Sequence, residues 1–567
     1  MKTEKINGAE ALLKSLVNEG VEIIFGYPGG SIMPFYDELY NYGDRIRHIL
    51  VRHEQGAVHA AEGYARATGR VGVCVATSGP GATNLITGLA DALMDSTPVV
   101  CITAQVISSK LGTNYFQEAD TIGITIPVTK WNYQITNASE ISGVIAKAFY
   151  VARSGRPGPV LISLTRDAQV EMTEYRYEQY IPPVQKFNED AEHNEWLCQD
   201  VAGMINGAEK PLIIVGQGVI ISGAENQVLK IAESGNIPVI STLMGLSAFP
   251  TTHRLFAGFA GMHGNIAPNL MTQQSDLILA VGMRFSDRVT GDVSKYAPKA
   301  KIIHIDIDDS EFNKTVRSHV SIKGDASRVL KSISPGVKYR ERPQWWSFID
   351  DKRMIEKERI ISRDLTPVRG TKNISMAMAV DALARIGGGE PVVVTDVGQN
   401  QMFSARYSKF NKTRSMITSG GLGTMGFGLP AGIGAKLGVP DRQVVVITGD
   451  GGFQMSLQEL GTIMQSGIDV KIMILNNSFL GMVRQWQELF FEGRYSFTSM
   501  DNPDFMKIAS AYNIKCARIE RAEDLDSKVK EMLDCKESFL LEVVVDKREN
   551  VFPMVPSGAP LDNIILK

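Results

Sequence analysis

The 567-residue chain has the composition of an ordinary globular protein, with 44% hydrophobic and 21% charged residues. Its 59 basic and 62 acidic side chains give a net charge of −3, which predicts neither nucleic acid nor an anionic membrane as a partner. The five cysteines are irregularly spaced without a CxxC, which argues against a disulfide framework or a zinc site and favours a reducing compartment.

The first residues, Met1 to Gly8, are charged and lead directly into a helical pattern. They have neither the apolar core of a signal peptide nor the Arg- and Ser-rich composition of a transit segment. No uncharged apolar run reaches the roughly 20 residues that a membrane helix needs. We therefore expect a cytoplasmic protein.

Short apolar runs alternate with longer helical patterns, such as Ala9–Glu19 and Met376–Arg385. Most of the runs have Val or Ile at consecutive positions, as in parallel strands that are covered on both faces. The expected strands include Gly72–Thr77, Val99–Thr103, Val160–Leu164, Leu212–Val215, Leu277–Val281, Lys301–Ile307, Val392–Thr395, Val444–Thr448 and Val470–Leu475. This alternation predicts an α/β protein with doubly wound parallel sheets.

Two polar stretches interrupt the alternation and are interpreted as linkers. They are Thr173–Asn194 and Gly336–Asn373, the second of which is expected to contain a short helix. The sequence thus predicts three doubly wound domains, at residues 1–175, 190–335 and 370–567.

In the first predicted domain, Glu54 follows the apolar run Ile49–Val51 and begins an alanine-rich helical stretch. A carboxylate in the first turn of a helix is favoured by the helix dipole. Taken alone, Glu54 is therefore an ordinary helix-start residue.

The middle predicted domain has scattered features of a dinucleotide site. Gly216 and Gly218 follow a strand, but Ile221 replaces the third glycine of the GxGxxG fingerprint, so this signal is weak. Asp306 ends a strand, and Asp325 follows a glycine; either carboxylate could bind ribose hydroxyls. Each loop, considered separately, is also compatible with an ordinary surface loop.

The third predicted domain has the most specific pattern. Asp450 lies in a GDGG turn after one strand, and Asn477 closes a second strand 27 positions later. Carboxylate and amide oxygens, with a backbone carbonyl such as that of Phe479, are ligands that Mg²⁺ accepts beside phosphate oxygens. Both groups are expected at the carboxyl ends of parallel strands, where open sheets bind ligands. A GDG turn alone is common, but this spacing is not.

Together these segments resemble the catalytic subunits of acetohydroxyacid synthases, which are thiamine-diphosphate-dependent enzymes. The resemblance covers nearly the whole chain. It rests on GYPGG (26–30), RHEQ (52–55), TSGPGATN (77–84), FQEAD (116–120), GRPGPV (155–160), GMHG (261–264), RFSDRVTG (284–291), GGLGTMGFGLPA (420–431), GDGGF (449–453), NNSFLGMVRQWQ (476–487) and VFPMVPSGAPL (551–561).

The resemblance implies roles for individual residues. Glu54 would hydrogen-bond N1′ of the aminopyrimidine, Met425 would support that ring, and Gly30 and Gln117 would lie near the substrate. The implied diphosphate and metal residues are Gly449, Asp450, Gly451, Gly452, Asn477 and Phe479. The implied FAD residues are Arg156, Gly216, Gly218, His263, Gly264, Arg284, Asp306 and Asp325, and the implied substrate residues are Arg288, Met482, Val483 and Trp486.

The implied reaction is that of acetolactate synthase in branched-chain amino acid biosynthesis. Pyruvate loses carbon dioxide, and the hydroxyethyl carbanion condenses with pyruvate or 2-ketobutyrate to give acetolactate or acetohydroxybutyrate. The implied cofactors are thiamine diphosphate, Mg²⁺ and FAD, the last without net redox work. The implied partners are a second copy of the chain, in a homodimer or homotetramer, and a small regulatory subunit.

Other interpretations stay open at this point. The first is a pyruvate oxidase or another FAD-containing member of the superfamily. A glyoxylate carboligase is disfavoured by Glu54, a flavin-free catabolic synthase by the RFSDRVTG segment, and a non-catalytic scaffold by the presence of Glu54, Asp450 and Asn477. Arg166 departs from the lysine common in the family, which puts a proton-transfer role there in doubt. Met482, Val483 and Trp486 could also form an ordinary core face.

Overall fold

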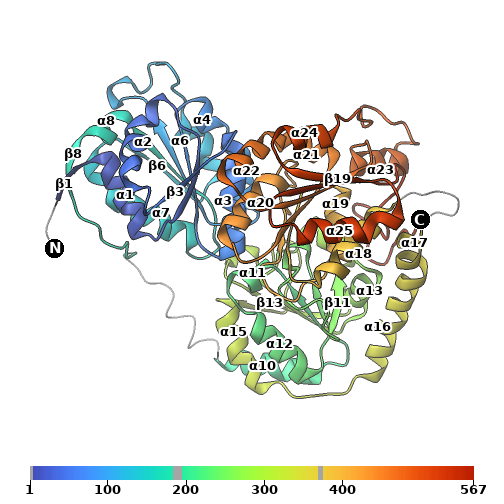
Figure 1. The fold of residues 1–567 in the computed structure, drawn as a ribbon. Helices are drawn as coiled ribbons and strands as arrows, with labels where there is room; N and C mark the ends of the chain where they lie inside the picture. Colours follow the sequence, from blue (N-terminus) through green and yellow to red (C-terminus); the bar gives the residue numbers. More distant parts are fainter. Residues whose placement is uncertain (1–3, 183–194, 368–373) are drawn as a thin grey trace.

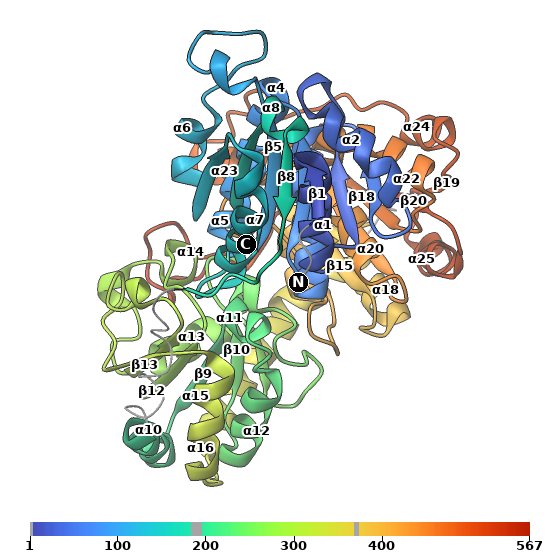
Figure 2. The same cartoon turned by 90° about the vertical axis from the view of Figure 1, so that its left-hand side faces the viewer.

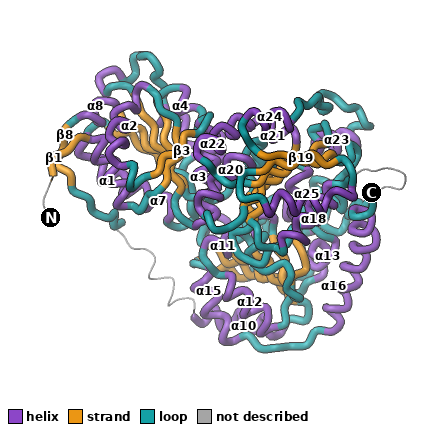
Figure 3. Tube along the Cα trace, viewed as in Figure 1, coloured by secondary structure: helices purple, strands orange, loops and turns teal. Residues whose placement is uncertain are grey.

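The computed structural model describes residues 4–182, 195–367 and 374–567. These residues form three α/β domains, each built on a six-stranded parallel sheet that helices flank (Figures 1 and 3). The middle domain lies below the other two in two views at right angles (Figures 1 and 2). The predicted architecture of three doubly wound parallel sheets is thus confirmed.

The N-terminal sheet has the strand order β3-β2-β4-β5-β7-β6. Its central strands are buried along their whole length, which explains their continuous apolar sequences. The strands are β2 (Ile23–Gly26), β3 (Arg47–Leu50), β4 (Gly72–Ala76), β5 (Val99–Gln105), β6 (Trp131–Ile135) and β7 (Val160–Thr165). The helices include α1 (Gly8–Asn18), α2 (Met33–Leu39), α3 (Glu54–Thr68), α5 (Ile86–Met94), α7 (Ile141–Arg153) and α8 (Arg166–Val170).

The middle sheet has the order β11-β10-β9-β12-β13-β14. Its strands are β9 (Pro211–Val215), β10 (Val239–Ser241), β11 (Phe256–Phe259), β12 (Leu277–Val281), β13 (Lys301–Asp306) and β14 (Val320–Lys323). The helices include α10 (Glu195–Gly207), α11 (Gln217–Ile221), α12 (Glu225–Gly235), α13 (Ile266–Gln274), α14 (Asp287–Thr290) and α15 (Ala326–Ile333).

The C-terminal sheet has the order β16-β15-β17-β18-β20-β19. Its strands are β15 (Val392–Thr395), β16 (Met416–Ile417), β17 (Val444–Gly449), β18 (Lys471–Asn476), β19 (Lys515–Ile519) and β20 (Phe539–Val544). The helices include α18 (Met376–Gly387), α19 (Gln399–Tyr407), α20 (Gly428–Gly438), α21 (Asp450–Ser456), α22 (Leu460–Ser466), α23 (Gly481–Phe490), α24 (Phe505–Ala511) and α25 (Leu525–Asp534).

The predicted linkers contain more regular structure than expected. The first overlaps β8 (Met172–Tyr175), which pairs antiparallel with β1 (Glu4–Asn7), whereas residues 183–194 lie outside the described residues. The second was expected to hold a short helix, which was wrong. There α16 (Pro343–Glu356) continues through a π-helical turn into α17 (Ser362–Asp364) before residues 368–373, which are not described. Few of its residues are buried, so its apolar period is weak.

The N- and C-terminal domains meet along α3 and α20, which lie side by side in Figure 1. A Cβ atom at Gly63 would stand 1.9 Å from the carbonyl oxygen of Ala431, and one at Gly434 would stand 1.7 Å from that of Ala60. The two helices therefore touch backbone to backbone, which only glycine permits at these positions.

In the described part of the chain, none of the helices combines the length and the apolar character that crossing a membrane requires.

Candidate active site

Most candidate residues lie in loops at the carboxyl ends of the strands. In the C-terminal sheet the chain reverses direction along the sheet between β15 and β17, so the loops that follow these strands diverge. Asp396 follows β15, Asp450 follows β17 and Asn477 follows β18. Open α/β sheets bind ligands at such a switch point.

Asp450 and Asn477, the two expected metal ligands, are both buried. Asn502 donates a hydrogen bond from Nδ2 to Oδ2 of Asp450 over 2.6 Å. Burial raises the pKa of Asp450 to about 6. The Nδ2 of Asn477 donates to Oε1 of Gln399 over 3.2 Å, and its Oδ1 accepts the Phe479 N–H over 3.0 Å. An amide oxygen has a second lone pair, so Asn477 can still coordinate an ion.

These residues fit Mg²⁺ and a diphosphate. A carboxylate and an amide oxygen are hard ligands of the kind that Mg²⁺ prefers, and a bound cation would offset the burial of the Asp450 charge. Nearby, Oδ1 of Asn400 is buried without a hydrogen-bond partner in the described structure. Its Nδ2 lies 3.4 Å from the place where a Cβ of Gly449 would stand, so a glycine keeps this crevice open.

The glycines after Asp450 have packing roles of their own. A Cβ at Gly451 would stand 2.8 Å from Cδ2 of Leu480, and its next neighbours include Cε of Met425 at 3.7 Å. A Cβ at Gly452 would stand 2.3 Å from Oδ1 of Asp396. Gly451 thus adjoins the expected pyrimidine support, whereas Gly452 is required by the close approach of a buried carboxylate.

Glu54 begins α3 and has 9% of its surface exposed. The Nδ2 of Asn84 donates a hydrogen bond to Oε2 of Glu54 over 2.9 Å. Its Oε1 lies 3.3 Å from the place where a Cβ of Gly81 would stand. The loop 77–84 therefore holds the carboxyl group, and the sequence reading did not anticipate the role of Asn84 in doing so.

Gly30 and Gln117 converge on the same loop. Gly30 begins a 3-10 turn and adjoins open space, and the next residue, Ser31, shares a hydrogen bond with Ser78 over 2.9 Å. Gln117 has a φ of +59°, and its carbonyl oxygen lies 2.8 Å from the place where a Cβ of Gly79 would stand. The structure thus gathers Glu54, Gly30 and Gln117 around one loop of the N-terminal domain.

A cavity of about 1040 Å³ opens where the three domains meet. It lies at the switch point of the middle sheet, between β9 and β12, and loops from the other two domains complete it. Of the expected residues, its wall includes Arg156, Gly218, His263, Arg284, Arg288, Asp306, Asp325, Met482 and Trp486. These residues are far apart in the sequence, and the fold brings them to one space.

Charged groups of both signs line this cavity. Arg156 pairs with Asp308 over 3.4 Å and with Glu311 over 3.1 Å, and its Nε donates to Ser96 over 2.8 Å. Neither Glu311 nor Asp308 was among the expected site residues. Asp325 caps α15 by accepting the backbone N–H of Arg328, so this carboxylate also has a structural role.

Two ionisable groups on the wall are strongly affected by burial. His263 is buried, and burial, with the charges of Arg406 and Arg288, lowers its pKa to about 3. Its Nδ1 has no hydrogen-bond partner in the described structure. Burial raises the pKa of Asp306 to about 6. The cavity is large enough for a dinucleotide. Its arginines suit phosphate groups, its carboxylates suit ribose hydroxyls, and the unpaired ring nitrogen of His263 is a further polar atom for such a ligand.

Some expected residues are not on the cavity wall. A Cβ at Gly216 would stand 2.1 Å from the Gly282 carbonyl oxygen, and Gly264 lies in a tight turn, so packing accounts for both glycines. Val483 is 48% exposed, because it lies about 100° around α23 from Met482. Arg166 begins α8 and is exposed.

One face of α23 does reach the cavity. Met482 and Trp486 lie one turn apart and both contribute to the wall, as i and i+4 residues on one helix face should. Trp486 also packs against Phe490, with ring centroids 5.2 Å apart. Arg288 is half-exposed on α14, and its Nη1 lies 3.6 Å from Sδ of Met262. This places Arg288 where the cavity meets solvent.

Three family models match the chain in the order of its domains. "Thiamine pyrophosphate enzyme, N-terminal TPP binding domain" matches residues 6–124, the central domain of the same enzymes matches 198–333, and their C-terminal TPP binding domain matches 396–543. Together they span most of the chain.

Relatives match over nearly the full length. The chain is 44% identical to a probable acetolactate synthase large subunit of Methanocaldococcus jannaschii, covering 99% of this chain and 95% of the relative. It is 42% identical to the acetolactate synthase large subunit of Haemophilus influenzae, covering 99% and 98%. It is 41% identical to the isozyme 3 large subunit of Escherichia coli, covering 99% of both chains.

Proposed function

This chain belongs to the acetolactate synthase large subunits of the thiamine pyrophosphate enzyme family, and on that premise we propose that it decarboxylates pyruvate and joins the remaining two-carbon unit to a second 2-keto acid. Pyruvate as acceptor gives acetolactate, and 2-ketobutyrate gives acetohydroxybutyrate. The observation that carries the proposal is the buried pair Asp450 and Asn477, which follows the neighbouring strands β17 and β18 at one edge of a parallel sheet in a family member.

Thiamine diphosphate, when bound, supplies the nucleophilic carbon and the electron sink that decarboxylation needs. Asp450, Asn477 and the carbonyl of Phe479 would hold Mg²⁺ and, through it, the diphosphate. Glu54 would hold a proton at N1′ of the pyrimidine, while Asn84 keeps its carboxyl oriented. Met425 would support the pyrimidine ring from one side.

We infer that FAD occupies the central cavity. The arginines Arg156 and Arg284 would bind its phosphates, and the carboxylates Asp306 and Asp325 would bind hydroxyl groups. His263, whose low pKa keeps its ring neutral, offers Nδ1 as an unused polar atom. The joining of two 2-keto acids with loss of carbon dioxide involves no net oxidation or reduction. The flavin therefore has no electrons to accept in the net reaction.

Anaerobic turnover of pyruvate is expected to yield acetolactate without stoichiometric bleaching of bound FAD. The purified protein is supplied with thiamine diphosphate, Mg²⁺ and FAD, the product is identified, and stopped-flow absorbance follows the flavin band. Omission of pyruvate gives the baseline. Bleaching that keeps pace with carbon dioxide release, together with an oxidised acetyl product, would point instead to a pyruvate oxidase.

The substrate would enter past Arg288, whose guanidinium stands where the cavity meets solvent and can bind a 2-keto carboxylate. Gly30 and Gln117 would adjoin the reacting carbonyl from the N-terminal domain. Met482 and Trp486 would enclose the acceptor side chain.

We predict that Trp486→Leu leaves acetolactate formation largely intact but lowers the preference for 2-ketobutyrate over pyruvate. The two acceptors differ by one methylene, whose burial contributes ~0.8 kcal/mol, and a hydrophobic pocket discriminates it by ~1–3 kcal/mol. The ratio of acetohydroxybutyrate to acetolactate at a fixed acceptor ratio measures the effect.

The matched control is Phe491→Leu, which shortens an exposed aromatic residue just beyond α23. It should keep the wild-type ratio. If Trp486→Leu also keeps that ratio, Trp486 is only a packing residue of this helix.

We infer that the active unit contains at least two copies of the chain. In the family the cofactor binds between the N-terminal domain of one subunit and the C-terminal domain of another. Tyr115 and Phe116, beside Gln117, are 50% and 80% exposed, which suits a surface that a second chain covers. A homodimer or homotetramer fits these features, and the name "large subunit" of the relatives suggests a small regulatory subunit as a further partner.

A further inference from the structure

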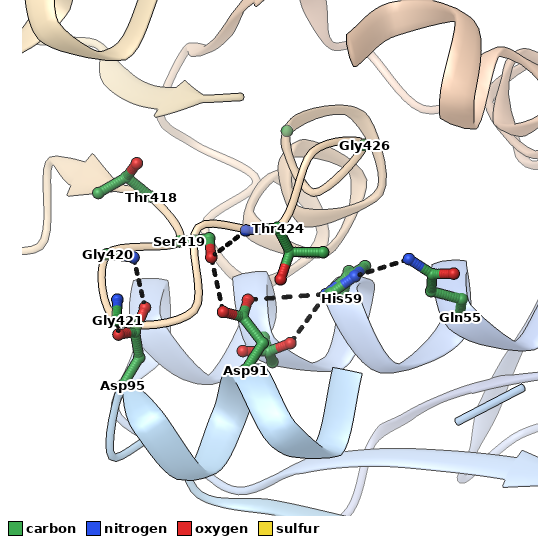
Figure 4. Close-up of polar contacts among 12 residues, drawn as sticks. Gln55, His59, Asp91, Asp95, Thr418, Ser419, Gly420, Gly421, Thr424 and Gly426 are labelled. Carbon is green, nitrogen blue, oxygen red and sulfur yellow. Dashed lines mark hydrogen bonds and ion pairs between the residues drawn. The ribbon is translucent and has the colours of Figure 1, made fainter. Parts of the chain in front are cut away.

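One loop of the C-terminal domain, Thr418–Gly426, is contacted by residues of all three domains, and Figure 4 shows its contacts with the N-terminal domain. A Cβ at Gly420 would stand 2.2 Å from Sδ of Met244 in the middle domain. A Cβ at Gly421 would stand 3.3 Å from Nη2 of Arg284, which belongs to the cavity wall. Neighbours outside its own domain therefore contribute to the path of the loop.

Two aspartates of the N-terminal domain contact the start of this loop. Asp91 lies on α5, and Asp95 is its C-terminal cap, one turn later. Oδ1 of Asp91 accepts the hydroxyl hydrogen of Ser419 over 2.6 Å. The two carboxylate oxygens of Asp95 accept the N–H groups of Gly420 and Gly421 over 2.8 and 2.7 Å. Both aspartates are almost fully buried.

The hydrogen bonds continue along the loop to Met425. Oγ of Ser419 accepts the N–H of Thr424 over 2.9 Å, so the residue that binds Asp91 also holds the residue before Met425. The residue after it, Gly426, donates its N–H to Asp396 over 3.1 Å. Met425 is thus fixed on one side through the N-terminal domain and on the other side through its own domain.

The buried charges are partly compensated. Nη1 of Arg66 lies 3.6 Å from Oδ2 of Asp95 and also donates to the carbonyl oxygen of Thr418. Burial, with the neighbouring Glu62 carboxyl, raises the pKa of Asp91 to about 8. Asn at position 91 keeps a carbonyl oxygen that can accept the Ser419 hydroxyl hydrogen, which makes Asp91→Asn a milder change than Asp91→Ala.

We propose that Asp91 and Asp95 are positioning residues, which fix the position of the loop Thr418–Gly426 relative to both the flavin cavity and the thiamine site. The proposal rests on the proposed function, because it takes Gly420–Gly423 as part of the FAD wall and Met425 as the support of the pyrimidine ring. Removal of either carboxyl group leaves buried donors unpaired and frees the loop to shift. A shift of the order of 1 Å is enough to cost about 100-fold in rate.

The first test measures the loop without cofactors or substrate. Hydrogen–deuterium exchange of peptides that cover 418–426 reports the amides that these side chains protect. In Asp95→Ala the Gly420 and Gly421 amides should exchange at least about tenfold faster, because local opening becomes easier. In Asp91→Ala the Thr424 amide should do so, whereas Asp91→Asn, which keeps an acceptor for Ser419, should exchange like the wild type.

A buried acid elsewhere provides the matched control. Asp364 is buried beside Arg363 and accepts the hydroxyl hydrogen of Tyr407 over 2.7 Å, and no hydrogen bond or ion pair among the described residues joins its side chain to the loop. Asp364→Ala should lower the thermal stability but leave exchange at 418–426 unchanged. If exchange at 418–426 increases as much in Asp364→Ala as in Asp95→Ala, the carboxylates of Asp91 and Asp95 only stabilise the fold. That result would overturn the proposal.

The second test separates positioning from folding in the holoenzyme. Asp95→Ala and Asp91→Ala are expected to lower kcat about 10- to 100-fold with KM for pyruvate within a few-fold of wild type. The same variants should bind FAD about tenfold more weakly in a fluorescence titration, with Asp91→Asn close to wild type. Faster exchange without loss of kcat or FAD affinity would overturn the role. If the wild-type protein forms no acetolactate, the proposed function is contradicted. The exchange experiment would still test whether Asp91 and Asp95 hold the loop, because it needs no activity.

Discussion

Replacing Glu54 with Gln is expected to leave a folded protein that binds thiamine diphosphate but turns over about 10²–10⁴-fold more slowly. The amide keeps an oxygen that can accept the hydrogen bond of Asn84, so the local structure should persist. It cannot hold a transferable proton at N1′ of the pyrimidine. The measurement is kcat for acetolactate formation together with a cofactor titration.

Glu459→Gln is the control for this change. Glu459 is a buried carboxyl that accepts the backbone N–H of Arg52, just before Glu54, over 3.1 Å. Its amide variant alters charge near the same helix start without touching the expected site, so kcat should stay within a few-fold of wild type. Glu54→Gln activity at that level would remove Glu54 from the mechanism.

Asp450→Ala is expected to abolish cofactor-dependent activity. Mg²⁺ would lose its only anionic protein ligand in this arrangement, and Asn477 with waters cannot replace the charge. Titration with thiamine diphosphate in the presence of Mg²⁺ should show greatly weakened binding, and excess Mg²⁺ should not restore full activity.

Asn502→Ala helps to interpret this result. It removes the 2.6 Å hydrogen bond to Asp450 but keeps the carboxylate, so a partial loss of affinity that excess Mg²⁺ can offset is expected. Diphosphate affinity that Asp450→Ala leaves unchanged would show that the metal site lies elsewhere.

The sequence predicted the parallel sheets because their strands are buried on both faces and so contain continuous apolar runs. The ends of such strands are well defined, so the sequence predicts that Asp450 and Asn477 lie at one edge of the sheet, where the structure has them. The segment Pro343–Asp364 was underestimated for the opposite reason. It forms an extended helical run along the surface, where few side chains are buried and the helical period is weak.

The contacts that position the site could not be read from the sequence. Asp91 and Asp95 stand in an apolar helix, and their partners lie more than 300 residues later in the chain. Asn502 likewise gave no signal, because a single polar residue in a loop has many possible neighbours. The FAD residues were individually weak candidates. The reversal of chain direction between β9 and β12 and the packing of the other two domains against this edge of the middle sheet together bring them around one cavity.

The contact between α3 and α20 has a consequence for motion. At Gly63 and Gly434 the two helices meet through main-chain atoms, without flexible side chains that could repack during a rotation. Within one subunit the two outer domains should therefore behave as a single rigid body. A closure that excludes water during turnover must then come from loops at the cavity or from displacement of the middle domain. Replacement of either glycine with alanine would push α3 and α20 apart and disrupt the contact between the two domains, rather than make a hinge more flexible.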